Sequence, residues 1–242
     1  MPGSICSKEE ATTMKTIGLI GGMSWESTQT YYQLINQRVR DELGGLHSAR
    51  LVLYSVDFAE IEALQHQGDW AATGEILGAV GKALAAAGAD FIVLCTNTMH
   101  KVADSIEKAS GLPMLHIADA TADALHRDGI DCVGLLGTKF TMEQAFYKER
   151  LENRGIRVLV PGDAQREFVH TVIYDELCRG IIRQPSKQGY LQVLDSLAAR
   201  GAQGIILGCT EIGLLVQQAD TAIPLYDTTR IHAEQAVAHA LA

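Results

Sequence analysis

The chain has 242 residues, 47% of them hydrophobic and 20% charged, and its formal net charge is −9 at pH 7. This composition is typical of a globular protein with one large core or two smaller ones. The negative charge argues against a broad electrostatic attraction to nucleic acid or to an anionic membrane. We therefore expect a small-molecule partner, and neither nucleic acid nor membrane.

The five cysteines form no C-x-x-C pair and no spacing with histidine that matches a zinc site, so no metal is predicted. An odd number of cysteines and no recognisable signal peptide favour a reduced, cytoplasmic protein. The apolar runs are too short to cross a bilayer. Residues 1–13 are small and polar without periodicity, and we predict a disordered leader there.

From residue 15 onward, strand, turn and helix patterns alternate along the chain. Apolar runs predict strands at 16–20, 50–54 and 91–94, and apolar residues at helical spacing predict helices at 28–43, 73–87, 168–177 and 231–241. A further helix is expected to begin near residue 99. This alternation predicts open parallel sheets with helices on both faces.

Three segments of the first half of the chain recur, in the same order, in the second half. The strand and turn at 17–21 return at 133–137, the segment 91–98 returns at 204–211, and 112–115 resembles 223–226. Three echoes in one order indicate an internal repeat.

The repeat predicts an α/β fold of two pseudo-symmetric, doubly wound halves. The first half comprises residues 14–115 and 223–242, because the last helix returns to it, and the second comprises 116–222. Ligands of open α/β sheets bind beyond the carboxyl ends of the strands. The active site is therefore expected in the cleft between the halves, with Thr96 and Cys209 on opposite sides of it.

Cys209 follows the strand expected at 204–207 and precedes a predicted helix. Because the free N–H groups at a helix N-terminus lower the pKa of a thiol, Cys209 is a candidate catalytic residue with a lowered pKa. The alternative is a small, buried, apolar cysteine. Thr96 holds the matching place in the first half.

The other candidate site residues follow strand ends. The loop at 21–28 reads G-G-M-S-W-E-S-T. It lacks both G-x-G-x-x-G spacing and a Walker lysine, so it predicts backbone N–H groups that bind an anion rather than a nucleotide site.

Threonine and asparagine after a strand bind a carboxylate, cap a helix, or do both. The predicted substrate-binding residues are Met23, Ser24, Asn97, Thr98, Thr138 and Thr210. His100 and His116 are expected to pack or cap, and Arg179 either reaches a substrate carboxylate or lies on the surface.

The chain reads I-G-L-I-G-G-M at 17–23, C-T-N-T at 95–98 and G-C-T-E at 208–211. On these motifs, residues 14–242 resemble the aspartate/glutamate racemase family throughout. Longer segments, such as L-C-T-N-T-M-H-K-V-A-D and G-C-T-E-I-G-L-L-V, are most similar to its enterobacterial branch specific for L-aspartate and L-glutamate. The resemblance implies a racemase that needs no pyridoxal phosphate or other cofactor, and a homodimer.

The family mechanism implied by this resemblance uses one thiolate to remove the Cα proton and a thiol on the opposite face to return one. Cys209 matches the second cysteine of the family, whereas Thr96 stands at the place of the first. Cys95 is out of register by one residue, so its side chain is expected to point elsewhere. The resemblance implies that the second cysteine, here Cys209, faces the α-hydrogen of the L-isomer. Because a threonine hydroxyl cannot be a standing base, we expect turnover of L-substrates and little or none of D-substrates, with Thr96, alone or with a water, returning the proton.

Some family members bind the substrate's side-chain carboxylate with an arginine after the second strand and a lysine after the mid-chain helix. The corresponding segments of this chain read S-V-D-F at 55–58 and C-R-G at 178–180, so these cations are not cleanly in place. Three functions therefore stay open. The favoured one is a racemase acting on L-aspartate and L-glutamate. The others are a broad-specificity amino-acid or hydantoin-type racemase and a non-catalytic protein that binds acidic amino acids.

Overall fold

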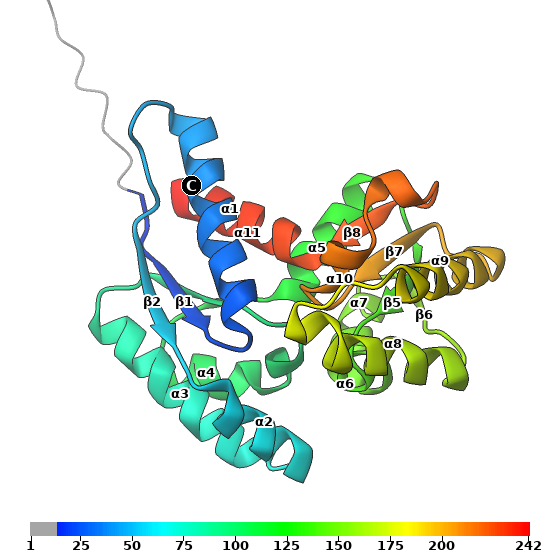
Figure 1. Cartoon of the computed structure of the whole chain (residues 1–242). Helices are drawn as coiled ribbons and strands as arrows, with labels where there is room; N and C mark the ends of the chain where they lie inside the picture. The colour runs from blue at the N-terminus through cyan, green and yellow to red at the C-terminus, as the bar shows by residue number, and fades with distance from the viewer. Residues whose placement is uncertain (1–13) are drawn as a thin grey trace, which may run out of the picture.

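The computed structural model describes residues 14–242, so the leader predicted at 1–13 lies outside the described residues. Two four-stranded sheets of parallel strands lie one in each half of the molecule (Figure 1). The first has the order β2-β1-β3-β4 and contains β1 (Ile17–Gly21), β2 (Leu51–Ser55), β3 (Phe91–Leu94) and β4 (Met114–Leu115). The second has the order β6-β5-β7-β8 and contains β5 (Cys132–Leu136), β6 (Arg157–Leu159), β7 (Gly204–Leu207) and β8 (Leu225–Asp227). The equal order confirms the predicted α/β fold of two similar halves.

Helices pack around both sheets (Figure 1). Those that follow the strands of the first sheet are α1 (Trp25–Leu43), α2 (Phe58–Gln67), α3 (Trp70–Ala86), the 3-10 helix η1 (Thr98–Val102) and α4 (Ala103–Ser110). The chain then forms α5 (Ile117–Arg127), α6 (Lys139–Glu143), α7 (Ala145–Glu152), α8 (Asp163–Asp175), η2 (Leu177–Arg179), α9 (Gln184–Ala199), α10 (Ile212–Leu215), η3 (Gln218–Asp220) and α11 (Thr228–Leu241). None of the helices within residues 14–242 is long and apolar enough to cross a membrane.

Both faces of the first sheet are packed. Ile17 and Leu19 lie in one apolar cluster with residues of α1 and α11, whereas Ile20 and Leu94 lie in another with residues of α3 and α4. The second half has two corresponding clusters. Because β1 and β3 are buried on both faces, the loops at their carboxyl ends start from fixed positions.

β8 corrects part of the predicted division of the chain. The sequence assigns all of 223–242 to the first half, but β8 pairs in parallel with β7 and so belongs to the second sheet. It completes that sheet as β4 completes the first, in keeping with the repeat of 112–115 at 223–226. α11 packs against α1, and it also contacts α5 of the other half. The remaining boundaries stay predictions.

Candidate active site

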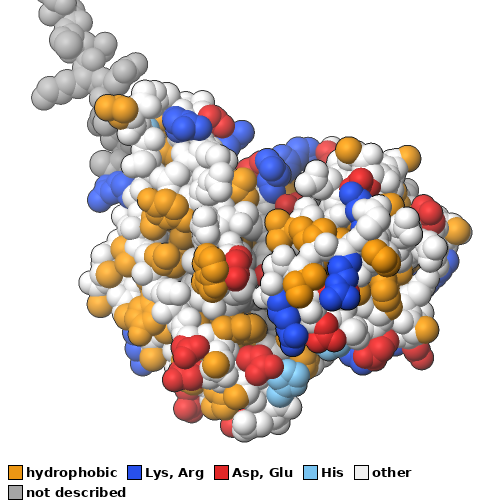
Figure 2. Space-filling view, in the orientation of Figure 1, with side chains coloured by type: hydrophobic (Ala, Val, Ile, Leu, Met, Phe, Trp, Pro, Cys, Tyr) orange, Lys and Arg blue, Asp and Glu red, His pale blue; other side chains and the backbone are white. Residues whose placement is uncertain are grey.

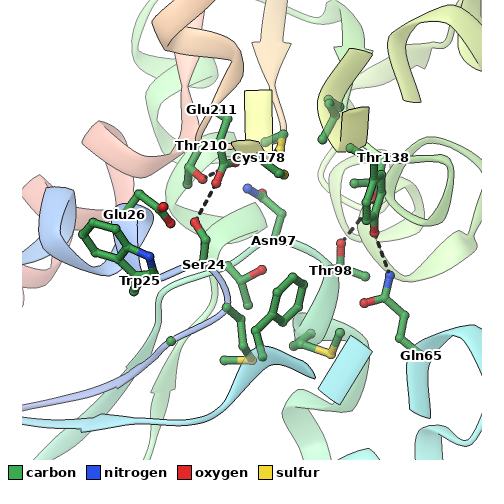
Figure 3. Close-up of a pocket in the computed structure, with 18 of the residues that line it drawn as sticks. Ser24, Trp25, Glu26, Gln65, Asn97, Thr98, Thr138, Cys178, Thr210 and Glu211 are labelled. Atoms are coloured by element: carbon green, nitrogen blue, oxygen red, sulfur yellow. Dashed lines mark hydrogen bonds between the residues drawn. The ribbon is translucent and has the colours of Figure 1, made fainter. Parts of the chain in front are cut away.

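A cavity of about 240 Å³ lies at the carboxyl ends of the strands of both sheets. Figure 2 shows a furrow between the two halves of the molecule, and Figure 3 shows side chains that line the cavity. The eight residues that the sequence predicts for the site all line it, namely Met23, Ser24, Thr96, Asn97, Thr98, Thr138, Cys209 and Thr210. The sequence therefore locates the pocket, while the role of each residue remains a prediction.

Thr96 and Cys209 occupy equivalent places in the two halves. Thr96 lies two residues beyond the end of β3, and Cys209 lies two residues beyond the end of β7. β3 and β7 each pair with the first strand of their own sheet, β1 and β5. The internal repeat therefore brings one hydroxyl and one thiol to the same cavity from two different sheets.

Cys95 does not share this position. It is fully buried in the apolar cluster with Tyr31 and Ala233, and burial raises the pKa of its thiol. The prediction that its side chain points away from the site is confirmed. Thr96 is therefore the residue that the first half offers at this point.

The loop after β1 reaches the cavity through a glycine. Gly22 has a φ of +98°, and a Cβ atom there would lie 2.2 Å from the carbonyl oxygen of Val56, so a side chain cannot be accommodated. Ser24 follows and caps α1, since its Oγ accepts the N–H of Ser27 at 3.3 Å. This cap explains why α1 begins three residues before the predicted helix.

Glu211 is the centre of the hydrogen bonds at the site (Figure 3). Its Oε2 accepts from Cys209 Sγ at 3.0 Å and from Thr210 Oγ1 at 2.6 Å. Its Oε1 accepts from Ser24 Oγ, in the other half, at 2.7 Å. Glu211 is only 7% exposed, and within residues 14–242 no cationic side chain pairs with it. A buried carboxylate thus has only neutral donors as partners.

The protonation of Cys209 differs from the expectation. Burial first, and then the adjacent Glu211 carboxylate, raise the pKa of the Cys209 thiol well above its ordinary value. The predicted lowering is wrong because α10 is a single turn of four residues and does not begin until Ile212. Without a ligand, Cys209 is therefore a protonated thiol that donates to Glu211.

The hydroxyl and amide groups predicted to bind a carboxylate are partly engaged with one another. Asn97 Nδ2 donates to Thr228 Oγ1 at 3.1 Å, and the hydroxyl of Thr210 donates to Glu211. Thr98 Oγ1 lies 3.4 Å from Thr138 Oγ1 and thereby links the two halves. Within the described part of the chain, Asn97 keeps its Oδ1 and its second amide N–H without a protein partner, whereas the Thr210 hydroxyl must exchange Glu211 for a substrate before it can donate to one.

A second contact between the halves lies on another wall of the cavity. Gln65 of α2 donates from Nε2 to the Tyr174 hydroxyl of α8 at 3.3 Å (Figure 3). Burial raises the pKa of Tyr174 to about 12. Because this hydroxyl already accepts from Gln65, its own proton is left to donate to another group.

Among the described residues that line the cavity, Glu26 and Glu211 are the charged side chains, and no lysine, arginine or histidine lines it. Arg179 is exposed and lies 3.9 Å from Asp175, so it is a surface residue rather than a ligand for a substrate carboxylate. No group of residues within 14–242 could hold a metal ion.

Sequence reasoning found the strand-end residues but missed Glu211, Gln65 and Tyr174 as parts of the site. Glu211 belongs to the motif G-C-T-E. A carboxylate two residues after the candidate thiol is a signal in the sequence that could have placed Glu211 at the site. Nothing in the sequence indicates that Gln65 and Tyr174 meet, because they are 109 residues apart. His116 caps α5 by accepting the N–H of Ala118, which agrees with the expectation for it.

Comparison with known proteins adds a family to this geometry. The model of the Asp/Glu/hydantoin racemase family matches residues 20–236. The crystal structure of a candidate Asp/Glu racemase from Yersinia pestis is 58% identical, with a TM-score of 0.90, over 95% of this chain and 100% of that chain. The structure of an aspartate racemase homologue from Pyrococcus horikoshii OT3 is 35% identical, with a TM-score of 0.83, over 94% and 99% of the two chains. The broad specificity amino-acid racemase RacX of Bacillus subtilis (strain 168) is 27% identical over 93% of this chain and 98% of its own length.

Proposed function

The chain belongs to the Asp/Glu/hydantoin racemase family and is an amino-acid racemase, and we propose that Cys209 is the base that starts its reaction. The observation that carries the proposal is the placement of Cys209 and Thr96. They lie at equivalent strand ends of two sheets and line one cavity, as acid–base groups on two faces of one carbon must.

In the proposed reaction the Cys209 thiolate removes the Cα proton of an L-amino acid. The Cα–H bond breaks, an Sγ–H bond forms, and the electron pair stays on Cα, delocalised into the α-carboxylate. A proton then reaches the opposite face of Cα from the side of Thr96, through its hydroxyl or a water bound to it. Solvent restores both groups to their starting protonation.

Glu211 supplies the reason why Cys209 becomes a base only when substrate is present. We assign the substrate's α-ammonium to Glu211, because this buried carboxylate has only neutral partners. The ammonium charge offsets that of the carboxylate, which lowers the raised pKa of the Cys209 thiol. It also releases the hydroxyls of Ser24 and Thr210, which become donors for the α-carboxylate, where negative charge builds up.

L-Aspartate and L-glutamate are the first substrates we propose. Support comes from the motifs and from the likeness to the Yersinia candidate racemase and the Pyrococcus homologue. A side-chain carboxylate would have neutral donors in this cavity, and the Tyr174 hydroxyl is one whose proton is available.

A neutral amino acid is a second candidate, and a specific observation favours it. The cavity is lined by two carboxylates, Glu26 and Glu211, without a cation to offset a third. A substrate with an uncharged side chain avoids that repulsion. The likeness to a broad specificity racemase points the same way.

We also propose that the enzyme is a cytoplasmic homodimer. The outer face of α1 and the loop after it expose Tyr32, Leu43 and Leu46, and the edge strand β2 exposes Leu53 and Tyr54. Natural proteins usually cover an exposed edge strand beside apolar side chains. Light scattering coupled to gel filtration tests this; a monomer at all protein concentrations contradicts it.

The test of the reaction is α-hydrogen exchange in deuterated water with chiral separation of the products. L-Aspartate, L-glutamate and L-alanine are offered separately, to the wild type and to Cys209→Ala. Deuterated D-product from the wild type alone supports the proposal, and the best substrate decides between the acidic and the neutral class. Failure of the folded wild type to exchange any of the three overturns the proposed substrates and favours another substrate or a binding protein.

A further inference from the structure

Three buried histidines lie behind the cavity and do not line it. His100 is on η1, His116 precedes α5, and His232 is on α11. The ring of His100 lies between the other two, with centroid distances of 4.5 Å to His116 and 5.7 Å to His232. This cluster joins the turn after β3 to both segments that cross between the halves.

The hydrogen bonds of His100 fix its tautomer. Its Nε2 receives the backbone N–H of Ile117 at 3.2 Å and must therefore be unprotonated. The proton of a neutral ring is then on Nδ1, which lies 2.8 Å from the carbonyl oxygen of Thr96 and donates to it. Burial, together with the neighbouring His116 and His232, lowers the pKa of His100 well below its ordinary value, so the ring stays neutral.

Thr96 is thereby held on both sides of its peptide backbone. Its N–H donates to the carbonyl of Leu94 at 2.9 Å, and its carbonyl accepts from His100. Ile117, the other partner of His100, is the first residue of α5, just after the crossover from the first half to the second. The orientation of Thr96 is thus tied to the junction of the halves.

We propose that His100 is a positioning residue that holds Thr96, and with it the hydroxyl that returns the proton, on the face of the substrate opposite Cys209. This inference rests on the proposed function. It assigns to the Nδ1–H of His100 a role in the second proton transfer, on the Thr96 side, and none in the first, on the Cys209 side.

Two substitutions at one position separate the two hydrogen bonds of His100. In His100→Asn, the amide nitrogen takes the place of Nδ1 and still donates to Thr96. In His100→Gln, the longer side chain reaches the place of Nε2, accepts from Ile117 and leaves the Thr96 carbonyl without its donor. His116→Asn is the matched control, because it removes a ring from the same cluster and retains a capping side chain for α5. The side chain that bonds the Thr96 carbonyl, His100, stays in place.

The kinetic expectation follows from the role of Thr96. In His100→Gln, kcat for conversion of the L- to the D-isomer falls by about 100-fold with little change in KM, the scale of loss expected from a misplaced group. Its Cα-deuterium isotope effect moves towards unity and its solvent isotope effect grows, because return of the proton becomes the slow step. His100→Asn and His116→Asn keep kcat within about tenfold of the wild type, and their isotope effects stay as in the wild type. A merely structural loss would lower kcat in all three variants without this change in isotope effects.

A measurement on the wild type keeps the proposal testable if a variant does not fold. Nitrogen-15 NMR of the histidine rings is expected to show a neutral Nδ1–H tautomer for His100 that persists below the pH at which an exposed imidazole takes up a proton. The opposite tautomer overturns the proposal, as do wild-type kinetics in His100→Gln. If the wild type racemises no amino acid, the proposed function has failed; if it does so and His100→Gln is unaffected, only the positioning role has failed.

Discussion

Replacing Glu211 by glutamine should make Cys209 more reactive and the enzyme less active. The substitution keeps the shape of the side chain and removes the carboxylate charge beside the thiol, where Sγ and Oε2 are 3.0 Å apart. The two changes have opposite signs because Glu211 has two effects in the proposed mechanism. It raises the pKa of the free thiol, and it binds the ammonium that later lowers that pKa.

The size of the first effect can be worked from the geometry. Because the carboxylate charge is shared by two oxygens, its centre is at about 4 Å from Sγ, where two like charges repel by about 4 kcal/mol at an effective dielectric constant of about 20. Removing that repulsion lowers the pKa of the Cys209 thiol, opposite in direction to its present shift. In Glu211→Gln the fraction of Cys209 present as thiolate at pH 7 therefore rises about a thousandfold. A less basic thiolate is also a weaker nucleophile, so alkylation is expected to be only about 30-fold faster than in the wild type.

The assay is modification by iodoacetamide, read by mass spectrometry on the peptide that contains Cys209, so that Cys178 at the same cavity does not interfere. kcat/KM is measured in parallel and is expected to fall by about 100-fold or more, the usual loss when one partner of a buried charge pair is removed. Glu26→Gln is the matched control, since it removes a carboxylate from the same cavity without contacting Sγ. Its alkylation rate should change less than about threefold. Unchanged or slower alkylation of Cys209 in Glu211→Gln would refute the reasoning.

Three further predictions follow. Cys209→Ala should lower D-product formation by about 1000-fold, the scale of a lost base, in the chiral assay, whereas substantial activity would remove Cys209 from the reaction. Thr96→Cys should raise kcat by about tenfold, because a thiol returns a proton more readily than a hydroxyl does, and no gain would contradict the place assigned to Thr96. Burial lowers the pKa of His232 to about 4 and of His116 to about 3, both below the value of about 6.5 in the unfolded chain. Below about pH 6.5 the unfolded chain therefore binds more protons at these two histidines than the folded chain does. Their contribution to the free energy of unfolding is fully present above about pH 6.5 and is lost as the pH falls. For His232 the loss amounts to about 3 kcal/mol by pH 4. Urea midpoints at several pH values measure this loss, and a midpoint that does not change between pH 7.5 and 4.5 would contradict it.

The two-sheet fold could be predicted because its signal is local and repeated. Buried parallel strands are short apolar runs, and three segments recur in order, so a fold of two similar halves followed from the pattern. The strand order within each sheet was not predicted and comes from the structure. The assignment of β8 was wrong because 223–226 and α11 are adjacent in sequence but belong to different packing units. Their adjacency in the sequence favoured placing both in the first half. The repeat of 112–115 at 223–226, by contrast, already indicated that 223–226 belongs to the second sheet.

The site could be predicted only as far as it follows from strand ends. Thr96 and Cys209 line one cavity because both follow strand ends, but the hydrogen bond between Ser24 and Glu211 joins residues 187 apart. Such contacts depend on how the halves approach each other, and no periodicity encodes that approach. The pKa of Cys209 was predicted with the wrong sign for a related reason. The expected helix, α10, is a single turn that begins after Cys209. The Glu211 carboxylate, which disfavours the thiolate, comes into contact with Sγ of Cys209 only when the loop is folded.

The expected preference for L-substrates has a limit that thermodynamics sets. Two enantiomers have equal free energies in water, so the equilibrium between them is symmetric, and a racemase must have equal kcat/KM values for the two directions. A threonine on one face can therefore lower kcat for the D-isomer only if KM falls in the same proportion. In physical terms, the D-isomer binds the enzyme form whose proton is on Cys209, and it waits there for the weak base on the Thr96 side. Progress curves from each pure enantiomer, with chiral separation, should give kcat values that differ and kcat/KM values that agree. Unequal kcat/KM values in pure enzyme would mean that one enantiomer is consumed by a reaction other than racemisation, and the assignment of Cys209 and Thr96 as a proton-exchanging pair would be wrong.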